Sequence, residues 1–251
     1  MTHNWLDFLD KNKNGMIRVL AIDFAKAFDS VDHALLIGKL CSYGAPLWLT
    51  NLLVNYFNDR TQLARINGKV SSRGIVSRGI PQGTVLGPVL FSMFTNDLTP
   101  CHRQQTTVIK YADDQTWSHA ISRGDHDYTH EEIENVYTWC TVNRMQLNLN
   151  KTKELLMHNF RIPPVVLPLH NRSVLIERVS SISILGVTLQ DNLTWVDHID
   201  TLVKRLRRLS YAFRILATSC SKHDMKRLFY SVIMPTLLYA FPPGAISRLG
   251  K

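Results

Sequence analysis

Three aspartates stand at positions where an unpartnered carboxylate is unfavourable. Asp23 follows residues 17–22, a nearly continuous apolar run that is typical of a buried strand. Asp113 and Asp114 follow the strand-like residues 106–111 and form the tip of an expected hairpin. Neighbouring carboxylates repel each other unless a cation neutralises them, and hard divalent ions prefer oxygen ligands. The three residues therefore indicate a magnesium site, although Asp is also common in ordinary turns.

Such a site could support phosphoryl transfer. Two magnesium ions about 3.5–4 Å apart activate an attacking oxygen and stabilise the leaving oxygen during an in-line displacement. Magnesium is usually held by one or two carboxylates together with substrate phosphates. An isolated Asp-Asp pair is more often a simple turn, so this interpretation depends on the motifs around it.

Those motifs form an ordered set. Residues 21–33 (AIDFAKAFDSVDH), 79–88 (GIPQGTVLGP) and 111–114 (YADD) resemble motifs A, B and C of reverse transcriptases from non-LTR retrotransposons. Residues 148–153 (NLNKTK) are similar to motif D, and residues 185–189 (LGVTL) to motif E at the entry to the thumb. The motifs follow the family order, and the resemblance runs over nearly the whole chain.

The resemblance implies an RNA-directed DNA polymerase, which adds deoxynucleoside triphosphates to a DNA primer on an RNA template. Asp23 and Asp113 would be the principal ligands of two Mg²⁺ ions, for which Mn²⁺ could substitute. Asp114 would support them, and the backbone carbonyl of Phe24 would be a further ligand. The ions would lower the pKa of the primer 3′-hydroxyl and neutralise charge on the triphosphate.

The same resemblance assigns residues to the substrate. Phe28, with Ala27 before it, would lie beneath the sugar as a steric gate against a 2′-hydroxyl, although a core aromatic is the alternative. Gln82 and Gly83 would contact the nascent base pair. Lys151 is a candidate general acid for the departing pyrophosphate, and an ordinary surface lysine is the alternative.

Basic residues gather in the C-terminal part of the chain. The formal charge is +9, yet residues 1–150 carry equal numbers of basic and acidic side chains. The excess lies in residues 151–251 and is densest at Lys204, Arg205, Arg207 and Arg208. This cluster resembles a thumb that grips nucleic acid through its phosphates, and a solvated face is the alternative. Gly186 would belong to the primer grip.

Apolar periodicity predicts the elements that position these residues. Strands are expected at 17–22, 106–111, 115–121, 147–157 and 183–189, and helices at 3–10, 86–97, 128–145, 195–217 and 222–239. Residues 32–57 are expected to be helical in two pieces, broken around residues 43–46. Residues 61–80 read as a β-ribbon. The fold class is α+β: a polymerase palm, with an antiparallel sheet and packed helices, over residues 1–192, and a helical thumb-like segment over residues 193–251.

Other sites are disfavoured by the pattern. The calcium-loop-like residues 10–15 lack a glutamate at the twelfth position, which is Ala21, and are interpreted as a turn. His119, His126 and His130 could ligate zinc but lack a fixed fourth ligand. The four cysteines are widely spaced, which argues against a disulfide framework and for a reducing compartment.

No signal peptide is recognisable at the N-terminus, and the most apolar stretch, residues 232–241, is shorter than the roughly 20 residues of a membrane span. We therefore expect a cytoplasmic or nuclear protein that does not associate with membranes. The 22 residues before Asp23 are too few for the fingers of the family, and its endonuclease is also not expected here. Three hypotheses follow: a truncated reverse transcriptase palm and thumb, a catalytically silent nucleic-acid-binding remnant, or an RNA-directed RNA polymerase, which Phe28 disfavours.

Overall fold

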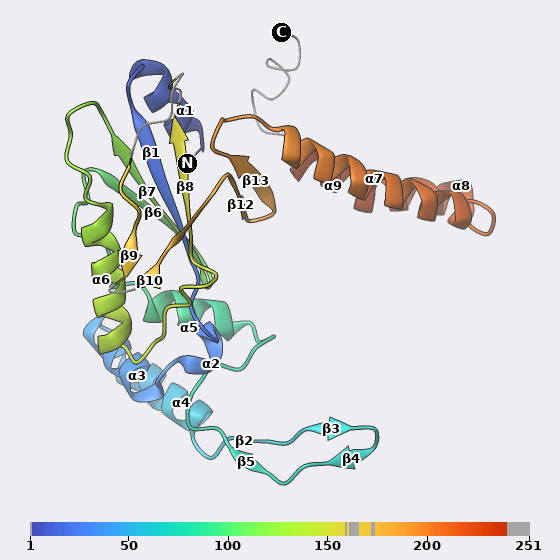
Figure 1. Ribbon diagram of the computed structural model, residues 1–251. Coiled ribbons are helices and arrows are strands. Elements are labelled where there is room, and N and C mark those ends of the chain that lie inside the picture. The colour runs from blue at the N-terminus through green and yellow to red at the C-terminus, as the bar shows by residue number, and fades with distance from the viewer. Residues whose placement is uncertain (1, 159, 161–165, 172–173, 240–251) are drawn as a thin grey trace. The chain divides into compact units, whose positions relative to one another are not determined.

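The computed structural model describes residues 2–158, 160, 166–171 and 174–239 (Figure 1). Two compact units, residues 1–178 and 179–251, make up the chain and are described separately. The predicted division between a palm and a thumb-like segment after residue 192 is functional, and it stays a prediction. Residues 161–165, which follow the predicted strand at 147–157, and residues 240–251, in the predicted thumb-like segment, lie outside the described residues.

A five-stranded sheet forms the centre of the first unit. Its strand order is β11-β8-β1-β7-β6. The strands are β1 (Met16–Ile22), β6 (Thr106–Tyr111), β7 (Asp114–Ile121), β8 (Lys153–His158) and β11 (Glu177–Val179). β1 is antiparallel to both β7 and β8, and β6 is antiparallel to β7. Together with its helices, the sheet confirms the predicted α+β class at the coarser level of a mixed α and β fold, and the assignment as a palm stays a prediction.

Helices cover one face of this sheet. Leu20, Ile22 and Phe24 alternate along β1 and its extension, and all three belong to the main hydrophobic core. Since side chains alternate between faces along a strand, Ala21 and Asp23 project from the opposite face. The core also includes residues of four helices, α3 (His33–Ser42), α4 (Leu47–Phe57), α5 (Leu86–Phe94) and α6 (Thr129–Val142). In Figure 1, α6 runs alongside the sheet, and the other three gather where β1 ends.

Most predicted elements of the first unit are confirmed, including α1 (Thr2–Lys11) and the turn before β1. The two helical pieces predicted within residues 32–57 are confirmed as α3 and α4. The short helix α2 (Ala27–Ser30), directly after Asp23, was not predicted. β8 begins at Lys153, because residues 148–152 form a turn. The predicted β-ribbon consists of β2 (Thr61–Gln62), β3 (Arg65–Ile66), β4 (Lys69–Val70) and β5 (Gly74–Ile75).

The second unit contains a hairpin and helices. The predicted single strand 183–189 is wrong, since β12 (Ser181–Ile184) and β13 (Val187–Gln190) pair across a turn. Leu185 and Gly186 both have positive φ there, as a two-residue hairpin turn requires. The helices are α7 (Val196–Leu216), α8 (Lys222–Leu228), η1 (Phe229–Ile233) and α9 (Met234–Tyr239). Among the described residues, no helix combines the length and apolar character of a membrane span.

Candidate active site

Strand pairing brings Asp23 next to Asp114. The last registered pair between β1 and β7 is Ile22 with Gln115, so Asp23 and Asp114 occupy the next opposed positions. Opposed residues share one face of a sheet, and the two carboxylates lie on the face opposite Ile22 and the helices. Asp23 is half-buried and Asp114 is exposed. Two of the three predicted ligands are therefore neighbours across two strands.

Asp113 lies at the tip of the hairpin that β6 and β7 form. Tyr111 pairs with Asp114, which leaves Ala112 and Asp113 as the connecting residues. Ala112 has a φ of 52°, a left-handed conformation that costs an L residue roughly 1–2 kcal/mol. Strain of this kind is common at functional sites. The tight turn holds Asp113 beside Asp114 and close to the end of β1.

The three carboxylates interact electrostatically. Partial burial raises the pKa of Asp114, and the negative charges of Asp113 and Asp23 raise it further. No cationic side chain is among the causes of this shift. A divalent cation would relieve the repulsion, so the charge distribution fits one.

The donor set also fits magnesium. In the described part of the chain, no three His, Cys, Asp or Glu side chains are gathered closely enough to hold a metal by themselves. Magnesium commonly takes one or two carboxylates and completes its shell with water and substrate phosphates. Asp23, Asp113 and Asp114 offer only oxygen donors and therefore suit an ion whose shell the substrate completes.

The backbone at Phe24 points a carbonyl toward the same region. Asn148 donates its amide to the Asp23 carbonyl, and Ala25 donates to the Gln146 carbonyl, both at 2.8 Å. These bonds flank the Phe24–Leu147 bridge. In this pattern the amide and carbonyl of Phe24 turn away from Leu147, toward the β7 side of β1. This orientation is compatible with the predicted ligand role of the Phe24 carbonyl.

Lys110 anchors the hairpin from the helix-covered face. Its Nζ donates to the carbonyls of Thr95 and Leu98, both at 2.5 Å, at the end of α5. Burial lowers the pKa of Lys110 to about 8. The residue immediately before Tyr111 is thereby tied to the helical layer, which restrains the hairpin tip.

Motif B lies against motif A through backbone hydrogen bonds. Gly79 donates to the Val31 carbonyl and Ile80 to the Phe28 carbonyl, both at 2.8 Å. The Gln82 side chain donates to Asp29 Oδ1 at 3.0 Å. These contacts join two segments about fifty residues apart in sequence. They hold Gln82 at the edge of the segment that follows Asp23.

Gly79 is the tightest point of this junction. Its φ is +92°, and a Cβ there would lie 2.9 Å from both Cα and the carbonyl oxygen of Asp29. We expect Gly79→Ala to lower the free energy of unfolding by about 2 kcal/mol or more, because the strained φ and the backbone clash add. Urea denaturation measures the change.

Gly38→Ala is the matched control for Gly79→Ala. Gly38 lies inside α3 with open space where its Cβ would be. Alanine there should stabilise the protein by about 0.5–1 kcal/mol, because glycine is unfavourable within a helix. Equal effects of the two substitutions would contradict the close approach at Gly79.

The other predicted substrate residues lie around this junction. Phe28 is half-buried, with its ring 4.8 Å from that of Phe91 in α5. Ala27 is buried in the core. Gly83 has a φ of +75° and open space beside it. Lys151 is exposed in the turn that begins at Asn148.

A hollow of about 650 Å³ opens beside motifs A and B. It lies between the base of the β-ribbon and the motif A and B segments, and the aspartate triad does not line it. Its charged and polar lining includes Lys26, Asp29, Arg60, Arg78 and Gln82. No role at the site was predicted from the sequence for Lys26, Asp29, Arg60 or Arg78. These residues lie close to one another because the β-ribbon folds back so that its two ends meet beside motif B.

The remaining predicted residues belong to the second unit. Lys204, Arg205, Arg207 and Arg208 are all exposed on α7. Gly186 forms the β12–β13 turn, where the Tyr239 hydroxyl donates to the Leu185 carbonyl at 2.6 Å. The nucleic-acid-binding roles of these residues stay predictions.

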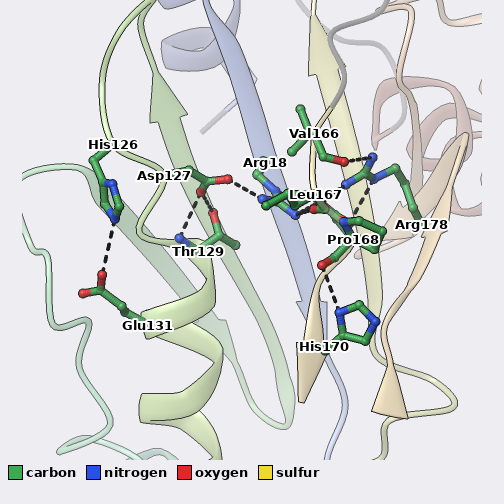
Figure 2. A network of polar contacts seen from close by, with 11 residues as sticks. Arg18, His126, Asp127, Thr129, Glu131, Val166, Leu167, Pro168, His170 and Arg178 are labelled. Carbon is green, nitrogen blue, oxygen red and sulfur yellow. Dashed lines mark hydrogen bonds and ion pairs between the residues drawn. The ribbon is translucent and has the colours of Figure 1, made fainter. Parts of the chain in front are cut away.

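A charge network that was not predicted from the sequence surrounds the buried pair Arg18 and Glu154 in the sheet (Figure 2). The Arg18 side chain on β1 is fully buried and donates through Nε to Glu154 Oε1 of β8 at 2.7 Å. It also pairs with Asp127 and donates to the Leu167 carbonyl. Arg178 donates to both oxygens of Glu154. One indication of this network is present in the sequence, which is the occurrence of an arginine within the apolar run 17–22.

The Asp127 carboxylate completes this network. Burial raises the pKa of Asp127, but hydrogen bonds from Thr129 and the charge of Arg18 outweigh it, so the pKa is lowered. Asp127 is therefore ionised when it pairs with Arg18. Nearby, His126 contacts Glu131 at 3.5 Å, and His119 is buried with Nδ1 3.1 Å from the Thr106 hydroxyl.

Comparison with known proteins places the chain in a family. The model of the reverse transcriptase (RNA-dependent DNA polymerase) family matches residues 2–189. The chain therefore belongs to the reverse transcriptase family. As predicted, its relatives include enzymes of non-LTR retrotransposons.

Two curated relatives illustrate the similarity. The chain is 29% identical over 235 residues to the probable RNA-directed DNA polymerase from transposon BS of Drosophila melanogaster, and 28% identical over 233 residues to that from mobile element jockey of Drosophila funebris. Each alignment covers 87% of this chain and 25% of the relative. The chain thus spans about a quarter of the length of these relatives.

A solved structure shares the fold. Apo telomerase from Candida tropicalis, truncated from its C-terminal domain, aligns with a TM-score of 0.51 at 13% identity. That alignment covers 77% of this chain and 38% of the telomerase chain.

Proposed function

We propose that this chain is the palm, with part of the thumb, of an RNA-directed DNA polymerase. The single observation that carries the proposal is the pairing that sets Asp23 opposite Asp114, with Asp113 at the adjoining turn. Membership of the reverse transcriptase family supports it. So do the names of the relatives, which are RNA-directed DNA polymerases.

In this proposal Asp23, Asp113 and the Phe24 carbonyl hold magnesium, and Asp114 supports them. Bound magnesium would activate the primer 3′-hydroxyl and offset the charge of the triphosphate. Asp29 orients Gln82 through their hydrogen bond, so that the amide can meet the nascent base pair. Lys151 would donate a proton to the departing pyrophosphate.

The second unit would hold the template and primer. The basic residues Lys204, Arg205, Arg207 and Arg208 are exposed on one long helix, and we propose that they contact the phosphates of the hybrid duplex. The backbone at Gly186, where a tight turn exposes peptide groups, would approach the primer terminus. Binding should then be largely independent of sequence and should weaken with salt.

Primer extension tests this function directly. The full chain is incubated with an RNA template, a labelled DNA primer, deoxynucleoside triphosphates and Mg²⁺, and the products are sized. Template-directed extension that requires the divalent ion is expected. Binding of the hybrid without any extension would instead identify a catalytically silent nucleic-acid-binding protein. Extension with ribonucleotides in preference would indicate an RNA polymerase.

Phe28 should determine the choice of sugar. We expect Phe28→Val to raise ribonucleotide incorporation relative to deoxynucleotide incorporation by roughly tenfold to a hundredfold, because a smaller side chain leaves space for a 2′-hydroxyl. Competing single-nucleotide incorporation measures the ratio. Phe91→Leu alters the packing partner of Phe28 and serves as the control, whose ratio should stay at the wild-type value. An unchanged ratio in Phe28→Val would remove Phe28 from the sugar site.

A further inference from the structure

A two-stranded arm, residues 60–78, connects the motif A and motif B regions. It contains β2 and β5 at its base and β3 and β4 at its tip, each pair antiparallel. All four strands are exposed on both faces. Figure 1 shows the arm extending away from the helices of the first unit. An extended and solvated ribbon contributes little to the core, so its residues are available to a partner.

The charge of this arm has one sign. It carries Arg60, Arg65, Lys69, Arg73 and Arg78, and no acidic residue occurs between Asp59 and Asp97. Residues 1–150 as a whole carry equal numbers of basic and acidic side chains. In the part of the chain that the structure describes, no acidic side chain pairs with Arg65, Lys69 or Arg73. These three cations are thus left for an external anion.

Cross-strand pairing at the tip combines charge with apolar surface. Arg65 is opposite Val70, and Lys69 is opposite Ile66, so each face of the tip carries one cation beside one aliphatic side chain. Ile66 is 71% exposed. Neither face is a continuous apolar surface of the kind that docks a protein. A polyanion with apolar elements between its charges matches this alternation.

Single-stranded RNA exposes both its phosphates and the apolar faces of its bases, whereas a duplex conceals the base faces. Phosphates would meet the cations, and unpaired bases would lie on the aliphatic side chains. In a duplex the bases are stacked and paired, and the deep major groove of A-form RNA is closed to side chains. The arm contains no aromatic residue for base stacking, so contact with the backbone should dominate.

The base of the arm leads to the candidate active site. Arg60 and Arg78 line the hollow of about 650 Å³, together with Gln82 and Asp29. Arg60 is held there by its position over the Tyr56 ring, at 4.9 Å from the ring centroid. A strand that lies along the arm can therefore continue into the hollow beside motif B.

We propose that the arm binds the uncopied, single-stranded RNA template through its phosphates and leads it toward Gln82. The proposal rests on the proposed function, because that function defines which strand enters beside motif B. The contacts are sequence-independent. They add affinity for a template overhang, while the hybrid duplex is held elsewhere.

Binding of two hybrids tests the proposal without any nucleotide. One probe is an RNA–DNA hybrid with a 5′ RNA overhang of roughly ten nucleotides, a length within the range of single-strand sites. The other is the same hybrid with a blunt end. Fluorescence anisotropy compares the wild-type chain with the triple variant Arg65→Ser, Lys69→Ser and Arg73→Ser.

The matched control removes three exposed cations at the other end of the first unit. It combines Lys11→Ser, Lys13→Ser and Arg123→Ser, which change the net charge equally. We expect the arm variant to lose about tenfold or more in affinity for the overhang probe and to lower its salt slope by about 2. Affinity for the blunt probe should be little changed, and the control should retain its preference for the overhang.

Equal losses on the blunt and overhang probes would overturn the assignment to the single-stranded template. Equal losses in the arm variant and the control would show that only net charge matters and would also overturn it. Because no nucleotide is present, this result is independent of primer extension. A chain that fails to extend primers but shows the arm-dependent preference would contradict the proposed function and support the arm.

Discussion

Replacing Asp113 by alanine should reduce the rate of primer extension by about a thousandfold or more. Asp113 stands at the turn between β6 and β7, beside Asp114 and close to Asp23. In the proposed function, removal of this carboxylate would leave the ion with fewer protein ligands and would weaken the positioning of the reacting oxygens. Since the transition state depends almost entirely on positioning and electrostatics, little activity should remain.

Single-turnover extension with saturating hybrid measures this loss. Asp125→Ala is the control, because Asp125 is also an exposed turn aspartate, and its carboxylate accepts a local hydrogen bond from the Ser122 amide at 3.0 Å. That variant should extend primers at a rate near that of the wild type. Extension by Asp113→Ala at the wild-type rate would refute the assignment of Asp113 as a metal ligand.

The stability of Asp113→Ala toward urea shows whether the variant has lost a metal ligand or has a damaged fold. Burial and the charges of Asp113 and Asp23 raise the pKa of Asp114 above the ordinary carboxyl value. Ionisation of Asp114 therefore opposes folding, and this opposition grows as the pH rises through the raised pKa. Without metal at neutral pH, Asp113→Ala should unfold at the same or a higher urea concentration than the wild type. A marked decrease would mean that the variant loses activity through misfolding.

Replacing Arg18 by methionine should lower the free energy of unfolding by about 3–5 kcal/mol. The substitution retains most of the aliphatic volume but removes the charge. Glu154, whose side chain is also fully buried, would then depend on Arg178 alone. An ionised carboxylate that loses a buried partner keeps its desolvation cost and loses the interaction that offset it.

Loss of Arg18 should also affect the candidate site. Asp23 directly follows β1, the strand that carries Arg18, and the network joins this strand to Asp127, Leu167 and Arg178. Weaker attachment of these segments should increase local opening of β1. Amide hydrogen exchange should show lost protection in β1 and β8 before global unfolding.

Two further variants test whether the loss of stability in Arg18→Met comes from the burial of the charge or from the loss of an arginine as such. Arg144→Met removes an arginine that pairs with Asp32 at 2.7 Å but is 60% exposed, and it should cost no more than about 1 kcal/mol. Arg18→Met combined with Glu154→Leu removes both buried charges and should recover part of the loss. If Arg18→Met and Arg144→Met were equally mild in urea denaturation, Arg18 would not be a buried structural charge.

Local patterns carried the prediction of a metal site. Asp23, Asp113 and Asp114 were assigned to it because they stand in short, ordered motifs that resemble those of reverse transcriptases. Alternation and helical periodicity likewise predicted β1, β6, β7 and the principal helices, since these elements each bury one face. The predicted strand at 183–189 failed because Leu185 adopts a positive φ that its apolar side chain does not signal.

Relations between distant segments were decided only by the tertiary structure. The register that places Asp23 opposite Asp114 comes from strand pairing, which periodicity along one strand cannot specify. Two further relations depend on contacts between residues that are far apart in sequence. Arg60 and Gln82 line the same hollow, and Arg18 is buried against Glu154. The sequence by itself predicted which residues would hold an ion, and that assignment stays a prediction. Packing decided which of them meet, because contact between remote side chains is a property of the folded chain as a whole.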